Sequence, residues 1–175
     1  DNSGMLRSIA VDDLQKVVNL KVTGSINSND IIVMNNKMTN LHYLDLTDAD
    51  IVACDKEYYT GYKTADNILG DYMFYDKDKY ISIKLPKSIK SIASYAFNGC
   101  YYLRQVEFQE GITEIGPYAF SHCDNLLTVN LPSTLYKIAN HAFYNCQNLK
   151  TVTFPDNLEI IDGYAFNRCI KLTNL

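Results

Sequence analysis

The chain has 175 residues, which is enough for one domain of ordinary size or for a short array of repeats. Its hydrophobic share of 47% and charged share of 21% are those of a folded globular protein. The net charge of −4 argues against non-specific nucleic-acid binding, which needs a basic surface, and no stretch approaches the roughly 18 consecutive apolar residues that span a bilayer.

The N-terminal part is predicted to contribute a strand, a helix and one leucine-rich unit. Apolar residues at positions 18, 20 and 22 predict a first strand. Asn29 or Asp30 is suited to cap a short helix over residues 31–38. A spacing of L-x-x-L-x-L-x-x-A-x-I then follows, carried by Leu41, Leu44, Leu46, Ala49 and Ile51. We therefore assign residues 1–52 to an N-terminal capping region and an atypical leucine-rich unit.

Residues 53–68 interrupt this pattern as an irregular, tyrosine-rich insertion. Tyr58, Tyr59 and Tyr62 lie around Gly61. Tyrosine is frequent at recognition surfaces because it supplies a large contact area at a low entropy cost, so these three residues form a candidate binding loop. The segment is equally consistent with packing against the flank of the fold, and both interpretations stay open.

From residue 69 the sequence repeats every 23 residues, and we assign 69–175 to a regular array that stops inside a repeat. The positions that recur without a slip are Ala96-Phe97, Ala119-Phe120, Ala142-Phe143 and Ala165-Phe166; Cys100, Cys123, Cys146 and Cys169; and Leu103, Leu126, Leu149 and Leu172. One period upstream, Phe74 and Tyr80 keep the phase while Lys77 replaces the cysteine, so this unit is degenerate. The end inside a repeat predicts a longer protein or a partner that covers the last coil.

Each repeat is predicted to form one coil of a stack. Leu103, Val106 and Phe108 have the spacing of a short strand with one buried face, while Gln105 and Glu107 point outward. The Y-A-F-x-x-C stretch is predicted to form one turn of α-helix or 3₁₀ helix that directs Phe and Cys inward. Because one coil cannot bury both its sides, neighbours must stack. Stacking places the phenylalanines of successive coils roughly 5 Å apart in one ladder.

The pattern I-x-x-I-x-x-x-A-F-x-x-C-x-x-L-x-x-V-x-L-P resembles the BspA-like class of bacterial leucine-rich repeats. It is carried here by Ile89, Ile92, Ala96, Phe97, Cys100, Leu103, Val106 and Phe108, and it recurs in the following units. The resemblance is strong over residues 69–175 and less specific over 14–78. With the periodicity, it predicts an α/β fold: a right-handed leucine-rich-repeat solenoid of 23-residue repeats, with short parallel strands and short helix or 3₁₀ turns.

Proteins of this class are typically exported or surface-attached, come from host-associated microbes, and in several cases adhere to host matrix proteins or other cells. The resemblance therefore implies a non-enzymatic recognition module, extracellular or at the cell surface, whose partner is a host matrix or cell-surface protein. A glycan-binding module and a structural spacer of a larger surface protein stay as alternatives. No cofactor, nucleic-acid partner or membrane span is expected, and a signal or anchor segment is expected outside this sequence.

The cysteines, histidines and aspartates do not predict a catalytic or metal site. The repeat cysteines lack the short spacing of metal ligands, and parallel side chains of stacked coils suit a disulfide poorly, so structural thiols are favoured. Cys54 lies in a predicted loop and is the candidate for a reactive thiol. His122 adjoins Cys123, but nothing in the sequence orients it as a base. Asp45, Asp48, Asp50 and Asp55 cluster without the glycine and glutamate of an EF-hand, which favours a solvated turn over a calcium site.

The outward face of the strands is the second candidate surface, because solenoids commonly bind along their concave side. Its predicted residues are Ser82, Lys84, Gln105, Glu107, Thr128, Asn130, Thr151 and Thr153. These side chains are mostly small and uncharged, and no aromatic anchor is predicted among them. A plain solvated sheet is therefore the alternative interpretation.

Overall fold

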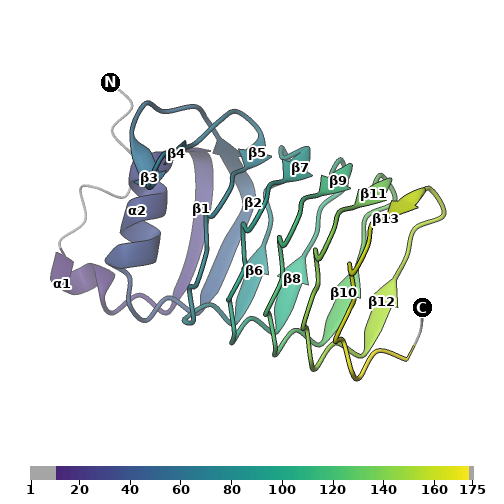
Figure 1. Ribbon diagram of the computed structural model, residues 1–175. Coiled ribbons are helices and arrows are strands. Elements are labelled where there is room, and N and C mark those ends of the chain that lie inside the picture. Colours follow the sequence, from purple (N-terminus) through teal and green to yellow (C-terminus); the bar gives the residue numbers. More distant parts are fainter. Residues whose placement is uncertain (1–10, 174–175) are drawn as a thin grey trace.

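The computed structural model describes residues 11–173, so residues 1–10 of the predicted capping region lie outside the described part. The described chain winds through short elements as a stack of coils (Figure 1). The helices are α1 (Val11–Leu14) and α2 (Ser28–Asn36). The strands are β1 (Asn19–Ile26), β2 (Tyr43–Ile51), β3 (Glu57–Tyr59), β4 (Tyr62–Lys63), β5 (Ile68–Leu69), β6 (Ser82–Lys84), β7 (Ser91–Ile92), β8 (Gln105–Glu107), β9 (Glu114–Ile115), β10 (Thr128–Asn130), β11 (Lys137–Ile138), β12 (Thr151–Thr153) and β13 (Ile160–Ile161).

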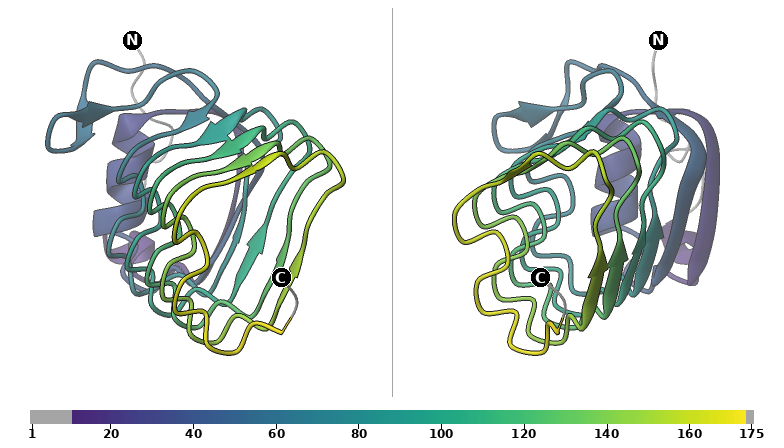
Figure 2. Two further views of the ribbon diagram at one scale, coloured as in Figure 1. Left: turned by 45° about the vertical axis from the view of Figure 1, so that its right-hand side comes forward. Right: turned by 90° about the vertical axis from the view of Figure 1, so that its right-hand side faces the viewer.

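Two sides of each coil are strands that pair in parallel with the neighbouring coils (Figure 2). On the first side, β1, β2, β6 and β8 pair in that order, and β10 pairs with β12. On the second side, β5, β7, β9, β11 and β13 follow one another. From β6 onward, partners on the first side are one period apart, as Ile83 and Val106 are, whereas Tyr43 of β2 and its partner Ser82 are 39 residues apart. The predicted short parallel strands and their 23-residue register are therefore confirmed.

The third side of each coil consists of turns, and the predicted helix or 3₁₀ turn does not form there in the described coils. Tyr95 has φ +58° and Gly99 has φ +76°, and the corresponding pairs in the next coils also have positive φ. A left-handed residue at every fourth position ends a right-handed helix before it completes a second turn. The backbone N–H groups bond to the next coil instead; that of Phe97 donates to the Ala119 carbonyl at 2.7 Å.

The core between the three sides contains the predicted phenylalanine ladder. Neighbouring rings lie 4.9–5.2 Å apart, and their planes are within 9° of parallel. Its members are Phe74, Phe97, Phe120, Phe143 and Phe166, all buried. Offset stacking of this kind adds about 0.5–1.5 kcal/mol per pair to the burial of the rings. The prediction of a ladder with roughly 5 Å spacing is confirmed.

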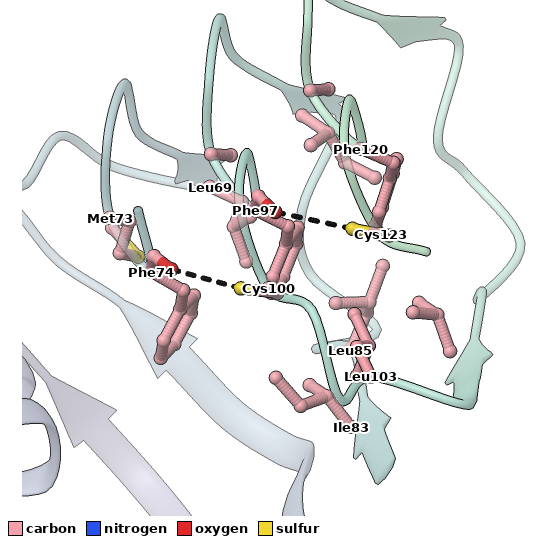
Figure 3. Packing of buried hydrophobic residues seen from close by; sticks show 14 of the residues in the cluster. Leu69, Met73, Phe74, Ile83, Leu85, Phe97, Cys100, Leu103, Phe120 and Cys123 are labelled. Atoms are coloured by element: carbon pink, nitrogen blue, oxygen red, sulfur yellow. Dashed lines mark hydrogen bonds between the residues drawn. The ribbon is translucent and has the colours of Figure 1, made fainter. Parts of the chain in front are cut away.

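The repeat cysteines point inward beside this ladder, as predicted. Each thiol donates a hydrogen bond to the carbonyl of the phenylalanine one coil earlier; the Sγ of Cys100 lies 3.0 Å from the Phe74 oxygen (Figure 3). The corresponding bond from Cys123 to Phe97 measures 3.2 Å. Burial raises the pKa of the Cys100 thiol to about 12, and it also raises the pKa of Cys123. Both thiols are therefore protonated at neutral pH and serve as packing groups.

At the N-terminal end, α2 takes the place that turns occupy in later coils. The helix begins earlier than predicted, because Asn27 is its N-cap: the Asn27 side chain accepts from the backbone N–H of Asn29, and Asp30 accepts from the backbone N–H of Asn27. Ile31 and Met34 of the helix are fully buried. The predicted first strand is confirmed as β1, although Val18 precedes it. Neither helix in residues 11–173 has the length and apolar character needed to cross a bilayer.

The C-terminus of α2 is held by one lysine from the next coil. The ammonium of Lys79 donates to the backbone carbonyls of Met34, Asn35 and Met38, the last two at 3.0 and 2.8 Å. Burial lowers the pKa of Lys79 to about 8, which leaves the group mostly protonated at pH 7 with three donors for three carbonyls. A cation at this end of a helix also interacts favourably with the helix dipole.

Candidate functional site

The predicted outward residues of the first side form one exposed surface, which we call the strand face. Its strands are seen side by side in Figure 1 as β6, β8, β10 and β12. Register places its residues in rows across the coils, such as Ser82 beside Gln105 and Thr128 beside Thr151. The exposed members of the predicted set are Lys84, Gln105, Glu107, Thr128, Asn130, Thr151 and Thr153, and Ser82 is half-buried. The structure thus brings the predicted residues together, as small polar side chains around a few charges.

The charges of the strand face are paired with one another. The ammonium of Lys84 lies 3.8 Å from the Asp45 carboxylate and 3.6 Å from that of Glu107. Asp48 pairs with Lys21 at 2.9 Å and with Lys87 at 3.1 Å. The hydrogen bond from Lys21 and its positive charge lower the pKa of Asp48, with Lys87 adding to the effect. Two of the four aspartates considered for calcium, Asp45 and Asp48, therefore face lysines, and residues 11–173 contain no group of three potential ligands placed to hold a metal ion.

The strand face has a seam between β8 and β10, which are neighbours without a ladder of hydrogen bonds. A small hollow of about 110 Å³ lies along it, lined by Gln105, Val106, Glu107, Phe108, Thr128 and Asn130. The turn after β8 is also the one that has Gln109 where the following coils have Pro132 and Pro155. The strand face is therefore two sheets that meet edge to edge.

Along the start of the strands runs a second row of residues, which we call the border row; its first two members are half-buried and the others are exposed. Each member donates its backbone N–H to the carbonyl of the previous member, at 2.8–3.2 Å. The row consists of His42, Ile81, Arg104, Leu127, Lys150 and Thr173. Between the border row and the strand face lies a shallow hollow of about 340 Å³, lined by Tyr43, Ile81, Ser82, Arg104, Gln105, Leu127 and Thr128.

Apolar and aromatic anchors that were not predicted from the sequence lie on and beside the border row: Leu127 is a member of it, and Tyr43 is the first residue of β2, paired with Ser82. Tyr43 is 45% exposed and Leu127 is 42% exposed, and both line the hollow. Tyr102, which is 52% exposed, lines an adjoining hollow of about 280 Å³ with His42, Asp78, Lys79, Ile81 and Arg104. The 23-residue period could have identified the border row from Ile81 onward, because the residue directly before each strand recurs at that spacing. It was missed because these residues show no common chemistry from coil to coil.

The candidate binding loop folds back as the hairpin β3–β4 and packs on the flank of the solenoid. The Tyr58 hydroxyl donates to the Asp71 carbonyl at 2.7 Å, and burial raises the pKa of this phenol. Tyr59 stacks on Tyr72 at 5.2 Å, and the Tyr62 ring lies 5.0 Å from that of Tyr72. Tyr58 thus acts in packing, whereas Tyr59 keeps 42% of its surface exposed. A binding role of this loop stays a prediction.

Replacing Tyr58 by Phe is expected to destabilise the hairpin while preserving the ring. The change removes the hydroxyl donor and leaves the Asp71 carbonyl without it, at a cost of about 1 kcal/mol. Hydrogen exchange of the β3–β4 amides and urea denaturation would measure the loss. Tyr59→Phe is the matched control, because within residues 11–173 the Tyr59 hydroxyl makes no hydrogen bond. Equal protection in both variants would contradict this role of Tyr58.

A comparison with known families decides what this array is. The profile of the BspA-type leucine-rich-repeat region matches residues 67–175 in six copies, which is more than half of the chain. The chain belongs to the BspA-type leucine-rich-repeat family. The predicted resemblance is confirmed, and no curated protein gives a significant match.

Solved structures of bacterial leucine-rich-repeat proteins resemble this BspA-type chain. A Bacteroides ovatus protein has a TM-score of 0.52 at 20% identity, over 90% of this chain and 48% of its own, and supports the shared fold. A Bacteroides capillosus protein is 27% identical over 57% of this chain and 70% of its own, with a TM-score of 0.46. A leucine-rich cell surface protein of Faecalibacterium prausnitzii is 22% identical over 69% of this chain and 44% of its own, with a TM-score of 0.40.

A second aromatic ladder runs along the surface of the BspA-type array. Tyr72, Tyr95 and Tyr118 stack at 4.9 Å in successive coils, and His141 continues the stack at 4.6 Å from Tyr118. Tyr164 follows His141 at 5.0 Å. All five have positive φ, where glycine or asparagine is usual. Stacking between coils offsets that backbone strain, so His141 packs at the coil surface as a tyrosine substitute.

The adjacent residues His122 and Cys123, considered as a base and a nucleophile, also have structural positions in the BspA-type array. Cys123 is fully buried and donates to a backbone carbonyl, so it faces away from solvent. His122 lies outside, with its Nδ1 3.1 Å from the Asn145 side-chain nitrogen. The adjacent pair in sequence is therefore split between the core and the surface. Cys54 is half-buried, with its sulfur 3.9 Å from the Asn29 amide nitrogen.

Proposed function

We propose that this chain is a non-enzymatic recognition module of an exported or surface-attached protein, and that it adheres to a host matrix or cell-surface protein. The family membership supports a protein-interaction role. The surface location and the adhesive role rest on what is typical of the family.

The observation that carries the proposal is the strand face together with its border row. Rigid, hydrogen-bonded coils hold small polar side chains in rows, and exposed anchors, Tyr43 and Leu127, line one side. Interfaces combine such anchors with a polar surround that excludes water around them. A rigid surface also loses little conformational freedom on binding. These properties favour a partner with a broad, folded or extended protein surface.

A panel of immobilised host matrix proteins, paired with a glycan array, tests the proposal. We expect the chain to bind at least one matrix protein, and the double variant Thr128→Arg/Thr151→Arg to weaken that binding at least about tenfold, since two bulky side chains then stand on the strand face. Thr113→Arg, an exposed threonine that precedes β9 on the second side, is the matched control and is expected to bind normally.

The panel separates the alternatives. Signals on the glycan array alone would support a glycan-binding module in place of a protein-binding one. Silence on both panels would favour the structural spacer. Equal loss of binding in the Thr113→Arg control would indicate that the partner does not bind at the strand face.

A further inference from the structure

We propose that the border row binds an acidic, extended segment of a partner protein, in which an apolar side chain lies between two carboxylates. This inference rests on the proposed protein-recognition function and names the chemistry of the partner. The residues that carry it are Arg104, Leu127 and Lys150, which occupy the same position in three successive coils.

The backbone fixes the order of these three side chains. The N–H of Leu127 donates to the Arg104 carbonyl at 3.2 Å, and the N–H of Lys150 donates to the Leu127 carbonyl at 2.9 Å. Each residue is exposed. The row therefore presents a cation, an apolar side chain and a second cation on neighbouring strands.

The two cations differ from the other cations near the strand face because they are unpaired. Lys21, Lys84 and Lys87 all lie within 4 Å of a carboxylate of the same surface. Within residues 11–173, the guanidinium of Arg104 and the ammonium of Lys150 make no ion pair or hydrogen bond. Asp78 shares the second hollow with Arg104 without forming an ion pair with it. The lysines of the strand face are thus neutralised by its own carboxylates, and the positive charge available to a partner is that of the border row.

The apolar component lies between and beside the charges. Leu127 and Tyr43 line the hollow of about 340 Å³ together with Ile81, and Tyr102 lines the neighbouring hollow. Exposed aromatic and aliphatic side chains in a shallow hollow can contact an apolar side chain of a peptide. A sulfated glycan supplies the negative charge but has no such apolar side chain, which favours a polypeptide.

The spacing matches an extended chain that runs across the strands. Neighbouring strands are about 4.8 Å apart, so Arg104 and Lys150 stand about 10 Å apart along the array. Side chains of an extended polypeptide alternate between two faces and advance about 3.3 Å per residue, so two carboxylates four residues apart face the row together with the apolar side chain midway between them. These carboxylates are about 13 Å apart along the chain, and the long, flexible side chains of Arg104 and Lys150 span the difference. Arginine binds a carboxylate through two parallel hydrogen bonds, whereas lysine contributes a point charge.

A labelled peptide that repeats Glu-Ser-Leu-Ser three times, which places Glu and Leu on one face of an extended chain, is the probe, with fluorescence anisotropy as the measurement. We expect saturable binding to the whole chain that weakens as salt is raised. The double variant Arg104→Gln/Lys150→Gln should weaken binding about tenfold, and Leu127→Ser should weaken it severalfold. Lys37→Gln/Lys90→Gln removes two exposed charges elsewhere and should leave binding unchanged.

Peptides of the same length separate the contributions. Replacing Glu by Gln should abolish binding, and replacing Leu by Ala should weaken it to the level of the Leu127→Ser variant. Binding that both double variants retain, or that both lose equally, would overturn the proposal. So would heparin binding that depends on Arg104 and Lys150 when the peptide does not bind, because the row would then be a general polyanion site. No peptide binding by a chain that still binds a matrix protein through the strand face would overturn this proposal and leave the recognition function intact.

Discussion

Phe120→Ala is expected to lower the free energy of unfolding by about 3–5 kcal/mol. Phe120 is fully buried at the middle of the phenylalanine ladder. It stacks on Phe97 at 4.9 Å and on Phe143 at 5.2 Å, and it also contacts Phe108 at 5.6 Å. Truncation therefore removes two stacking contacts and leaves a cavity that hydrogen-bonded coils on either side cannot collapse to fill.

Urea denaturation, followed by circular dichroism, gives this free energy directly. Tyr102→Ala is the control, because Tyr102 is large and aromatic but half exposed, and it should change stability by less than about 1 kcal/mol. Equal stability of the Phe120→Ala variant and the wild type would contradict a stacked ladder that carries the core. A smaller loss with a broadened transition would indicate that the coils on the two sides of Phe120 unfold separately.

Lys79→Met is expected to have the next largest effect, about 2–4 kcal/mol. Methionine preserves most of the apolar stem but donates no hydrogen bond, so the carbonyls of Met34, Asn35 and Met38 lose their shared donor at the end of α2. Half-buried acceptors without a donor are costly because water reaches them poorly. The helix also loses the positive charge near its C-terminus.

The measurements for Lys79→Met are urea denaturation and hydrogen exchange of the α2 amides. We expect α2 to lose protection before the regular coils do, since the lost contacts are local to the helix. Lys77→Met is the matched control: the Lys77 ammonium lies 3.5 Å from the Asn36 side-chain oxygen and contacts no backbone carbonyl within residues 11–173. A similar loss in both variants would assign the effect to charge alone.

The sequence predicted the repeating part of the fold because its period is also the spacing of paired residues in space. Ile83 and Val106 are one period apart and pair directly, as Val129 and Val152 do. Inward residues such as Cys100 and Phe97 were predicted correctly for the same reason, since any slip in register would expose them. The strand face residues followed from alternation within the strands, although their role in binding stays a prediction.

The errors arose where local backbone conformation, and not periodicity, decides the structure. One turn of helix or 3₁₀ helix was expected over Y-A-F-x-x-C, with Phe and Cys directed inward. Tyr95 and its equivalents have a left-handed φ, which tyrosine rarely adopts. Stacking of each ring on its neighbours stabilises this backbone conformation. The start of α2 was predicted a few residues late because several polar residues in succession suit an N-cap, and only the geometry of Asn27 and Asp30 selects one.

The border row illustrates a different limit of sequence reasoning. Arg104, Leu127 and Lys150 share a position but not a chemistry, so periodicity marks the position without indicating a purpose. The carboxylates of the strand face form ion pairs with Lys21, Lys84 and Lys87. The sequence does not show these positions, so it could not indicate that Arg104 and Lys150 are unpaired. An exposed tyrosine at position 43 becomes an anchor only because β2 pairs with β6.

The seam between β8 and β10 interrupts the strand ladder on only one of the three sides of the described array. On the second side, β9 and β11 stay hydrogen-bonded across the same boundary, and on the third side Phe120 donates to the Ala142 carbonyl at 2.7 Å. The two continuous sides therefore resist separation, whereas on the strand face no ladder joins Gln105 to Thr128, although the adjacent Leu127 N–H still donates to the Arg104 carbonyl at 3.2 Å. We therefore expect any bending of the solenoid to be concentrated at the seam, while the sheet on each side of it keeps its own register.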